Sequence, residues 1–386
     1  MRVLHVINSL RAAEGGPSFA VSEMARRLEE VGLESPIVCR LSDAEVTGDR
    51  TRGPVVTLVP GGPLAPLVGR NVAMLRSPVY DADVVHVHGV WDPLLLAAAR
   101  LASKAGKPLV CTPHGMLAPW SMARHRIRKW PYYQALVRPM LLRVAAFHFI
   151  TRAEAALADR WMPAGVANFV VPIILAEEFY GALPSRNDAI GYFPQIPGDG
   201  PWVLFLSRIH PKKGLPRLIS AFPAVLQAFP KAQLVIAGGG DPGYVATVRG
   251  LVASAGIAGN THFVGRVIGP AKVALYRRAA ILAVPSSQEN FGMVFAESLA
   301  CGTPVLLTPE VDLHHEIMAV GAGFLTEADP AAVAGHLVDA MREPARLEAA
   351  GEAGRRWVLE YLRPKTVAKQ MAGNYERLRS GVASAS

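Results

Sequence analysis

Short apolar runs rich in valine and isoleucine alternate with helical patterns along almost the whole chain of 386 residues. Residues 2–8 (RVLHVIN) and 82–89 (ADVVHVHG) are two such runs in the first half, and the pattern restarts at residues 201–208 (PWVLFLSR). Strands that alternate with helices usually pair in parallel and carry helices on both faces of the sheet. The sequence therefore predicts an α/β protein with doubly wound parallel sheets.

The restart of the pattern predicts two domains of similar size. Residues 176–200 lie between the two halves and are rich in glycine, proline and aspartate, which is typical of a linker. We expect an N-terminal domain over residues 1–180 and a second domain over residues 199–363. Residues 364–386 add a final helical pattern and a short tail.

Composition argues against several other classes of protein. Hydrophobic residues make up 51% of the chain and charged residues 18%, which favours large cores over disorder. The three cysteines are far apart and form no C-x-x-C pair, so we expect a reducing compartment, no disulfide framework and no zinc site. No apolar run is long enough to span a bilayer or to serve as a signal peptide. We therefore expect a cytoplasmic protein.

Positive charge is concentrated in one part of the chain. The net charge is +9, and residues 93–153 contain ten Arg or Lys but no Asp or Glu. Such a segment is either a solvated basic face or a contact surface for an anionic partner, such as a membrane or a diphosphate. The aromatic residues do not form a nucleic-acid recognition motif, so we expect no nucleic-acid partner.

A group of cations follows the strand predicted at residues 201–206. Arg208, Lys212 and Lys213 stand just before a glycine, Gly214, and the carboxyl ends of parallel strands are where such sheets bind ligands. Cations packed in a turn can neutralise a diphosphate through charge-assisted hydrogen bonds. The alternative is an ordinary basic turn on the surface.

Gly238, Gly240 and Gly243 follow the next strand with the spacing G-x-G-x-x-G, which occurs in dinucleotide-binding loops. Such a site also requires an acidic residue about twenty positions later. No Asp or Glu occurs from residue 242 to residue 288. We therefore expect a tight glycine turn that lets a ligand approach the backbone, and no NAD or FAD.

Two glutamates, Glu289 and Glu297, are separated by seven residues. We expect a helix to begin at Phe291 and Gly292, where free N–H groups and the helix dipole favour an anion. Eight helical residues span about 12 Å, which is comparable to part of a nucleotide diphosphate sugar. The spacing is therefore consistent with Glu289 near a sugar and Glu297 near a ribose. Two ordinary exposed glutamates are the alternative.

Histidines and glycines follow the strands of the first half. His114 stands at a strand end and is a candidate for contacting substrate, and Gly16 belongs to a glycine loop suited to close backbone approach. His86 and His88 lie on the same face of a strand. No Asp, Glu or Cys is placed to complete a coordination shell with them, so we expect no metal.

Taken together, these motifs resemble the retaining glycosyltransferases of family 4, which have the GT-B fold of two facing Rossmann-like domains with a cleft between them. The most specific motif is ENFGMVFAE at 289–297. GGP at 15–17, HG at 114–115, SR at 207–208 and PKKG at 211–214 support it. The resemblance covers nearly the whole chain.

The resemblance implies a role for each motif. The catalytic residues would be His114, Glu289, Arg208 and Lys213. The residues that bind the donor would be Gly16, Arg208, Lys213, Gly238, Arg266, Val267, Glu289, Asn290, Phe291, Gly292 and Glu297. Among these, Arg208 and Lys213 would stabilise the diphosphate as it leaves, Glu297 would hold the ribose, and Arg266 and Val267 would contact the base.

The resemblance also implies an activity: transfer of a hexose from a UDP- or GDP-sugar to a glycan or lipid-linked acceptor, with retention and without a metal or other cofactor. The pathway would be the synthesis of a bacterial surface polysaccharide, either exopolysaccharide or lipopolysaccharide. An epimerase of the same fold and a non-catalytic nucleotide-sugar binding protein are the alternatives.

Two further segments fit this interpretation. Residues 116–143 mix tryptophans and tyrosines with Arg and Lys, which predicts peripheral attachment to the anionic inner face of the plasma membrane. The alternative is a helical hairpin whose tryptophans pack in the core. Residues 364–380 fit the C-terminal helix that crosses back to the first domain in this family.

Overall fold

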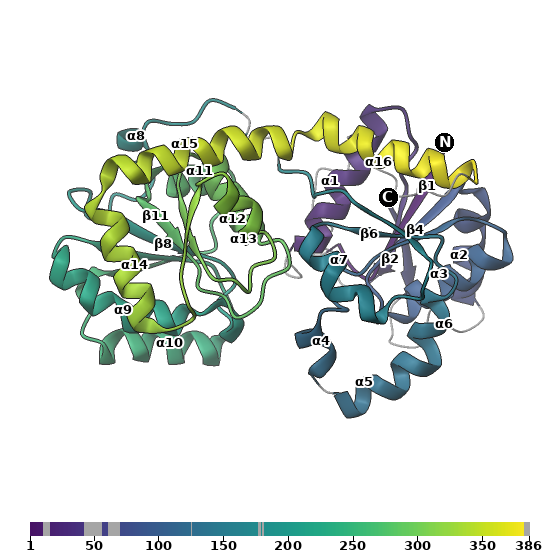
Figure 1. The fold of residues 1–386 in the computed structure, drawn as a ribbon, viewed down its shortest axis with the longest axis horizontal. Helices are drawn as coiled ribbons and strands as arrows, with labels where there is room; N and C mark the ends of the chain where they lie inside the picture. The colour runs from purple at the N-terminus through teal and green to yellow at the C-terminus, as the bar shows by residue number, and fades with distance from the viewer. Residues whose placement is uncertain are drawn as a thin grey trace. The chain divides into compact units, whose positions relative to one another are not determined.

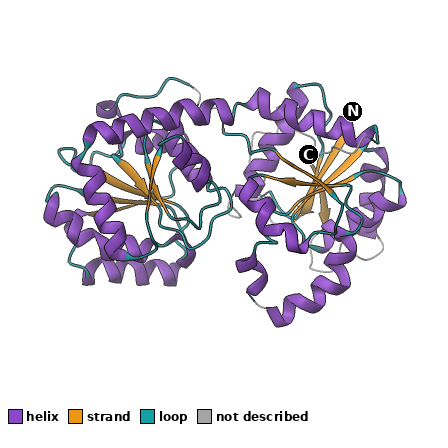
Figure 2. Cartoon of the chain, viewed as in Figure 1, coloured by secondary structure: helices purple, strands orange, loops and turns teal. Residues whose placement is uncertain are grey.

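The computed structural model describes residues 1–10, 16–41, 56–60, 70–124, 126–176, 179 and 181–381. The chain divides into two compact units, each built around its own sheet (Figure 1). Unit 1 comprises Met1–Ile174 and Leu362–Ser386, and unit 2 comprises Leu175–Tyr361. Figure 2 shows helices on both faces of each sheet. The predicted α/β class with parallel sheets is therefore confirmed.

Unit 1 contains a parallel sheet of seven strands in the order β3-β2-β1-β4-β5-β6-β7. The strands are β1 (Val3–Ile7), β2 (Ile37–Leu41), β3 (Val56–Pro60), β4 (Val84–His88), β5 (Leu109–Thr112), β6 (Ala146–Phe149) and β7 (Ala167–Val170). The order reverses between β1 and β4, which pair directly, with His5 opposite His86.

The helices of unit 1 pack against both faces of this sheet. They are α1 (Gly16–Glu30), α2 (Arg70–Asp81), α3 (Pro93–Lys104), α4 (Pro119–Ala123), α5 (Arg126–Tyr132), a π-helical turn (Tyr133–Val137), α6 (Arg138–Leu141), α7 (Arg152–Ala158), a 3₁₀ turn (Asp159–Trp161) and α16 (Pro364–Arg379). Val85 and Val87 of β4 face the core formed with α2, α3 and α6. His86 and His88 alternate with them and therefore point to the opposite face, which α1 and α16 cover.

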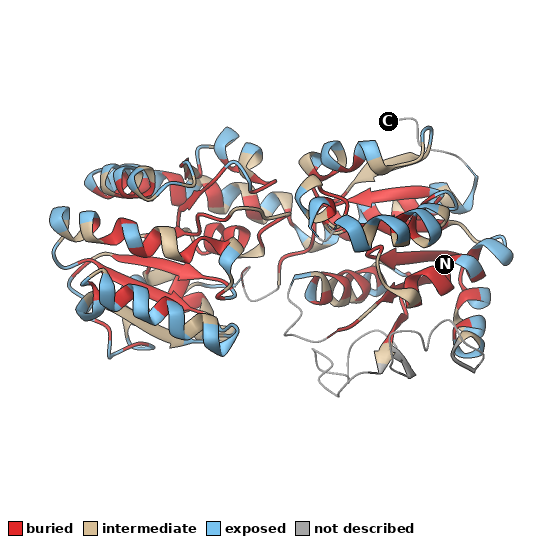
Figure 3. Cartoon of the chain, turned by 90° about the horizontal axis from the view of Figure 1, so that it is seen from below, coloured by how far each residue is buried: buried red, intermediate tan, exposed pale blue. Residues whose placement is uncertain are grey.

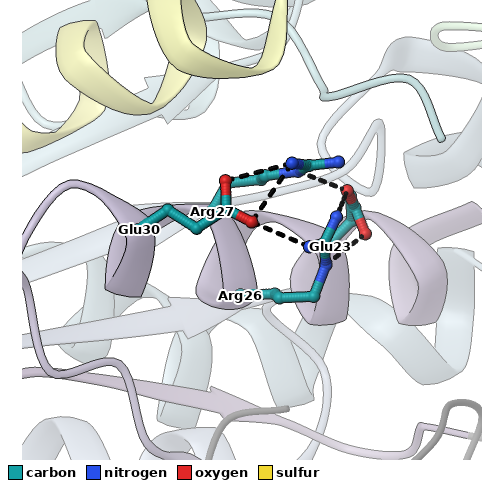
Figure 4. Close-up of polar contacts among 4 residues, drawn as sticks. All are labelled: Glu23, Arg26, Arg27 and Glu30. Carbon is teal, nitrogen blue, oxygen red and sulfur yellow. Dashed lines mark hydrogen bonds and ion pairs between the residues drawn. The ribbon is translucent and has the colours of Figure 1, made fainter. Parts of the chain in front are cut away.

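A charge-balanced cluster stabilises α1 (Figure 4). Arg27 is only 8% exposed, and its Nε lies 2.8 Å from a carboxylate oxygen of Glu23, one helical turn earlier. Arg26 makes a similar contact of 2.8 Å with Glu30, one turn later. Because a buried charge is costly unless it is paired, the two glutamates allow Arg27 to lie inside the unit.

Unit 2 contains a parallel sheet of six strands in the order β10-β9-β8-β11-β12-β13. The strands are β8 (Trp202–Leu206), β9 (Gln233–Ala237), β10 (Thr261–Gly265), β11 (Ile281–Ala283), β12 (Val305–Leu307) and β13 (Gly323–Leu325). The helices are α8 (Arg186–Ile190), α9 (Leu215–Ala228), α10 (Pro242–Ser254), α11 (Gly269–Arg278), α12 (Met293–Ala300), α13 (His314–Ala319), α14 (Pro330–Arg342) and α15 (Pro344–Tyr361), with 3₁₀ turns at Pro211–Lys213 and Ala258–Asn260. Figure 3 shows the central strands buried and the outer faces of the helices exposed.

The segment 176–200, which was expected to be a linker, packs onto unit 2 instead. Phe179, Phe193 and Ile196 are each less than 10% exposed, and the indole N–H of Trp202 donates to the carbonyl of Pro197 at 2.8 Å. Composition suggested a linker because glycine and proline also form the turns between these buried anchors.

Within the described ranges, each helix is too short or too polar to cross a bilayer.

Candidate active site

The predicted cations and the first predicted glutamate meet where the strand order of unit 2 reverses. β8 and β11 are hydrogen-bonded neighbours, and the sheet grows outward from them in opposite directions. Loops that leave two such strands diverge and form a ligand crevice at their carboxyl ends. The loop after β8 carries Arg208 and Lys213, and the loop after β11 carries Glu289.

Lys213 and Glu289 form an ion pair between these two loops. Both side chains are largely buried, at 9% and 16% exposure. A backbone hydrogen bond of 2.7 Å from Ser287 N–H to the carbonyl of Lys212 fastens the same loops. Burial lowers the pKa of Lys213 to about 7, and the charges of Lys212 and Arg208 add to this effect. The Glu289 carboxylate acts in the opposite sense by favouring the charged amine.

Gly214 allows the two loops to come this close. It adopts a left-handed φ of 72°, and a Cβ at this position would lie 1.9 Å from the carbonyl oxygen of Pro285. No other residue fits there without moving one loop away from the other. The glycine of the PKKG motif is therefore explained by packing between the loops that carry Lys213 and Glu289.

The glycines after β9 hold the loop that presents Arg208. A Cβ on Gly238 would lie 1.9 Å from the carbonyl oxygen of Ser207, and one on Gly240 would lie 2.2 Å from that of Ile209. The Ser207 N–H donates to the carbonyl of Ala237 at the end of β9 at 3.1 Å, and the Ile209 N–H donates to that of Gly239 in the following loop at 2.8 Å. Arg208, held between them, has an exposed side chain.

The helix after Glu289 begins later than expected. α12 starts at Met293, because Gly292 takes a left-handed φ of 72° and forms its N-cap. A Cβ on Gly292 would lie 2.5 Å from the ring of Phe295, so a glycine is needed here as well. Phe291 is buried, and the side-chain oxygen of Asn290 is buried without a hydrogen-bond partner in the described part of the chain.

Glu297 lies inside α12 and is 6% exposed. One carboxylate oxygen accepts from Lys272 Nζ at 2.6 Å, and the other accepts from the Tyr276 hydroxyl at 2.7 Å. Burial raises the pKa of Tyr276 well above its ordinary value, and the Glu297 carboxylate adds to the shift, so the hydroxyl remains a donor. The low exposure of Glu289 and Glu297 excludes the alternative of two ordinary surface glutamates.

Arg266 and Val267 lie in the loop between β10 and α11, where Arg266 is exposed. They therefore follow the outermost strand of the half-sheet that begins with β8. His114 and Gly16 belong to unit 1. Gly16 is the exposed first residue of α1, while the other glycine of its motif, Gly15, lies outside the described residues.

The backbone around His114 is held in an unusual conformation. His114 has φ 51°, the only positive φ of a residue other than glycine in the described ranges. The next N–H, that of Gly115, donates to a carboxylate oxygen of Glu154 at 2.6 Å, and Ile150 N–H donates to the other at 3.0 Å. Strained backbone of this kind is often found at functional sites. Burial lowers the pKa of His114 to about 3.

Sequence reasoning missed Lys272, Tyr276 and Glu154. Lys272 and Tyr276 lie one turn apart on α11, and their spacing to Glu297 carries no local pattern. Glu154 had a detectable signal, because residues 151–154 have the T-x-x-E capping-box pattern, and the Thr151 hydroxyl does accept from the Glu154 N–H at the start of α7. That signal would have predicted a helix start, and not the contact with Gly115.

Two doubly wound units of this kind define a GT-B glycosyltransferase fold, and solved structures agree. HepE from Anabaena, solved in complex with UDP and glucose, superposes with a TM-score of 0.80 at 19% identity, covering 97% of this chain and 99% of that one. WaaG, a glycosyltransferase involved in lipopolysaccharide biosynthesis, gives a TM-score of 0.72 at 16% identity, covering 97% and 99%.

The chain belongs to glycosyltransferase family 4. The family model Glycosyltransferase Family 4 matches residues 14–167, and the model Glycosyl transferases group 1 matches residues 192–357. The phosphatidyl-myo-inositol mannosyltransferase of Mycobacterium tuberculosis is 31% identical over 72% of this chain and 70% of its own. The GDP-mannose-dependent alpha-(1-6)-phosphatidylinositol monomannoside mannosyltransferase of that organism is 27% identical over 96% and 97%. The predicted family and transferase class are therefore confirmed.

Proposed function

We propose that this glycosyltransferase moves a hexose from a nucleotide diphosphate sugar to a glycan or lipid-linked acceptor, with retention and without a metal ion. The observation that carries the proposal is the pair of loops at the β8/β11 reversal, where Arg208 and Lys212 lie close enough to Lys213 to lower its pKa and Lys213 pairs with Glu289. Three cations therefore lie at the strand ends where such sheets bind ligands. GDP-mannose is the first donor to test, because relatives of this chain are GDP-mannose-dependent.

The cations of the crevice suit a diphosphate leaving group. When the bond to the sugar breaks, negative charge grows on the diphosphate, and preorganised cations stabilise that charge more than they stabilise the ground state. Lys213 is buried, so its contact with a phosphate would be poorly screened by water. We propose that Arg208 and Lys213 take the part that a divalent metal has in other transferases.

The start of α12 would complete the phosphate and sugar contacts. The N–H groups of Met293 and Val294 precede the first helical hydrogen bond and carry the positive end of the dipole, whereas that of Phe295 donates to the carbonyl of Gly292 at 2.9 Å. Gly292 and Phe291 bring this turn directly after Glu289. The buried side-chain oxygen of Asn290 could accept a hydrogen bond from a sugar hydroxyl, which would give it the partner it lacks within the described residues.

We propose that Glu297 binds the ribose. Lys272 and Tyr276 hold its two oxygens in place, and each oxygen retains a lone pair that can accept from a ribose hydroxyl. Arg266 and Val267 would contact the base from the neighbouring loop. Gly238 would let the diphosphate approach the backbone, and we propose Gly16 as a further donor-binding residue.

Glu289 and His114 would act at the sugar. Glu289 already holds Lys213, so we propose that it orients the sugar hydroxyls and the amine together. His114 is preorganised by its backbone, and as a neutral imidazole it can hydrogen-bond the sugar. Retention would follow from attack on the same face that the diphosphate leaves, and the anomeric proton coupling in the NMR spectrum of the product would show it.

The donor can be identified by thermal shift against GDP, UDP, ADP and their hexose derivatives, since a ligand that binds only the folded state raises the melting temperature. Arg208→Ala and Lys213→Ala should each raise the activation free energy by about 2 kcal/mol or more, which lowers kcat/KM roughly 30-fold. Lys231→Ala is the matched control, because Lys231 is exposed and pairs only weakly at the surface with Asp199. Full activity in both crevice variants would refute the assignment, and loss of activity in EDTA would refute metal independence.

We further propose that α4 and α5 bind an anionic membrane surface. Ile127 is 90% exposed, and Trp120 and Trp130 are each more than 40% exposed, beside the exposed Arg126 and Arg128. Apolar and aromatic groups next to cations are typical of an interfacial contact. The ring of Trp130 also stacks on the buried ring of Tyr133, with 5.8 Å between the ring centroids. The alternative of core packing is therefore correct for one side of Trp130.

Vesicle flotation tests the membrane proposal. The protein should float with anionic vesicles at low salt and much less with neutral ones. Replacing Arg126 and Arg128 together by alanine should weaken partitioning by about 2 kcal/mol, at about 1 kcal/mol for each charge near the surface. Lys365→Ala with Lys369→Ala removes the same charge from exposed positions on α16 and should leave partitioning unchanged. Absence of flotation with anionic vesicles would refute the proposal.

A further inference from the structure

A layer of histidines lines one face of the sheet in unit 1. It consists of His5 on β1, His86 and His88 on β4, His148 on β6, and His114 after β5. The first four are each no more than 5% exposed, whereas His114 is partly exposed. Burial lowers the pKa of each of these imidazoles, to about 3 for His5 and about 4 for His148, so all are neutral at pH 7.

One hydrogen-bonded chain in this layer has a fixed direction. The carbonyl of Val171 can only accept, so His148 donates to it from Nε2 at 2.8 Å. His148 Nδ1 must then accept from the Thr112 hydroxyl at 2.8 Å, and Thr112 in turn accepts from His86 Nε2 at 2.7 Å. His86 Nδ1 is left to accept from the Tyr375 hydroxyl at 2.7 Å. Each neutral imidazole therefore has one defined tautomer.

The second chain leads to His114 and has no carbonyl at its buried end. His5 Nδ1 lies 3.0 Å from His88 Nε2, and His88 Nδ1 lies 3.2 Å from His114 Nε2. His5 Nε2 is buried and has no partner among the described residues. The chain therefore has two possible directions, which differ in whether His5 buries a bare lone pair or an unpaired N–H.

We propose that His5 and His88 fix the tautomer of His114, so that His114 accepts at Nε2 from His88 and carries its proton on Nδ1. An orphaned N–H is rarer in protein interiors than an acceptor with an unused lone pair, which favours donation from His5 to His88 and from His88 to His114. His114 then has a fixed N–H to donate to an oxygen of a ligand. His5 and His88 are positioning residues in this scheme.

The hydrogen bonds that these imidazoles already make argue against a metal site among them. Ligand atoms of His5, His86 and His88 lie within 4.8 Å of one another. However, both ring nitrogens of His86 and of His88 already have protein partners. A divalent ion would have to break those bonds and would bring its charge into a neutral, buried layer.

The tautomer can be read directly from long-range ¹H–¹⁵N spectra of the full chain labelled at histidine. His114→Gln assigns the signals, and the exposed His315 of α13 serves as an internal reference. We expect His114 to be protonated at Nδ1 in the unmodified protein at pH 7.5. If His114 is instead protonated at Nε2, this spectrum alone overturns the proposal, and no variant of His88 is needed.

Two variants of His88 form a matched pair. His88→Asn places an amide N–H near the position of Nδ1, facing His114, and should preserve the tautomer. His88→Gln places its amide near the position of Nε2, facing His5, and should shift His114 toward protonation at Nε2 by roughly fivefold to tenfold, as expected for one lost hydrogen bond. An unchanged ratio in His88→Gln would show that His88 does not control it. The use of this N–H in catalysis rests on the proposed function, whereas the spectra report the tautomer whatever the protein does. The tautomer proposal and the proposed function can therefore fail separately.

Discussion

The histidine layer predicts that unit 1 loses stability steeply below pH 6.5. The four buried imidazoles of this layer, His5, His86, His88 and His148, remain neutral in the folded protein, because burial keeps each pKa well below the ordinary value. In the unfolded chain the pKa of histidine is about 6.5. As the pH falls below 6.5, the unfolded state therefore binds protons that the folded state cannot bind, and the free energy of unfolding decreases. Above pH 6.5 both states are neutral and this contribution is constant.

The magnitude follows from these pKa values. At pH 6 each locked imidazole lowers the free energy of unfolding by about 0.8 kcal/mol, and at pH 5 by about 2 kcal/mol. Four together give about 8 kcal/mol at pH 5 as an upper limit, since water entering the layer would let some rings protonate in the folded state. The free energy of unfolding of a typical domain is only about 5–15 kcal/mol in total. Unit 1 should therefore lose a large part of its stability between pH 6 and pH 5.

Hydrogen exchange resolved by mass spectrometry can follow each unit separately. Protection in peptides from β1, β4 and β5 should fall on acidification far more than protection in β8 and β9, because the fully buried histidines of the described chain lie in unit 1. His148→Gln is the control variant: its amide can still donate to the carbonyl of Val171 but cannot titrate. It should recover about 2 kcal/mol of the loss at pH 5. Equal loss of protection in both units would refute the reasoning.

Three further predictions follow from single contacts. Lys213 has a pKa of about 7 in the free protein, so it loses its charge as the pH rises above 7. Affinity for the nucleotide diphosphate should therefore fall by up to about tenfold per pH unit above pH 7, and it should not fall in Lys213→Arg. Isothermal titration calorimetry at pH 6.5 and 8.5 tests this prediction. Gly214→Ala should destabilise unit 2 by several kcal/mol, whereas Gly256→Ala, which has a similar φ of 68° and open space around it, should cost only about 1–2 kcal/mol; equal denaturation midpoints would contradict this. Tyr375→Phe leaves His86 Nδ1 without its donor and should cost about 1–3 kcal/mol in urea unfolding; a neutral effect would mean that the hydroxyl is not part of the layer.

Much of the fold could be predicted because its signals are local. Runs such as VLHVI and WVLFL are short and mostly apolar, and each is followed by a turn, so their strands and the sheet edge to which they lead could be predicted from the sequence. Local conformation produced the errors as well. α12 starts at Met293 because Gly292 is left-handed, and residues 176–200 pack onto unit 2 because their aromatic residues outweigh their glycine and proline content.

The candidate site could be predicted only in part. The loops that carry Lys213 and Glu289 both leave the carboxyl ends of predicted parallel strands, so the two residues could be expected at the same edge of the sheet although they are 76 positions apart. No local pattern links Lys272 to Glu297, or His5 to His88 across 83 residues, because such contacts depend on the register of strands and the facing of helices. The roles assigned to the donor-binding residues remain predictions that the proposed experiments test.

The last helix has a consequence for how this chain is made. α16 supplies Val367, Met371 and Tyr375 to a core that otherwise comes from residues 3–174, and the Tyr375 hydroxyl reaches a partner 289 positions earlier. A ribosome therefore releases all of unit 2 before it releases the segment that closes unit 1, so unit 1 cannot complete its core first, as an N-terminal domain usually does during synthesis. While translation continues, this face of the nascent sheet of unit 1 is covered only by α1, and a stop codon that removes only the final helix would leave exposed the part that α16 covers.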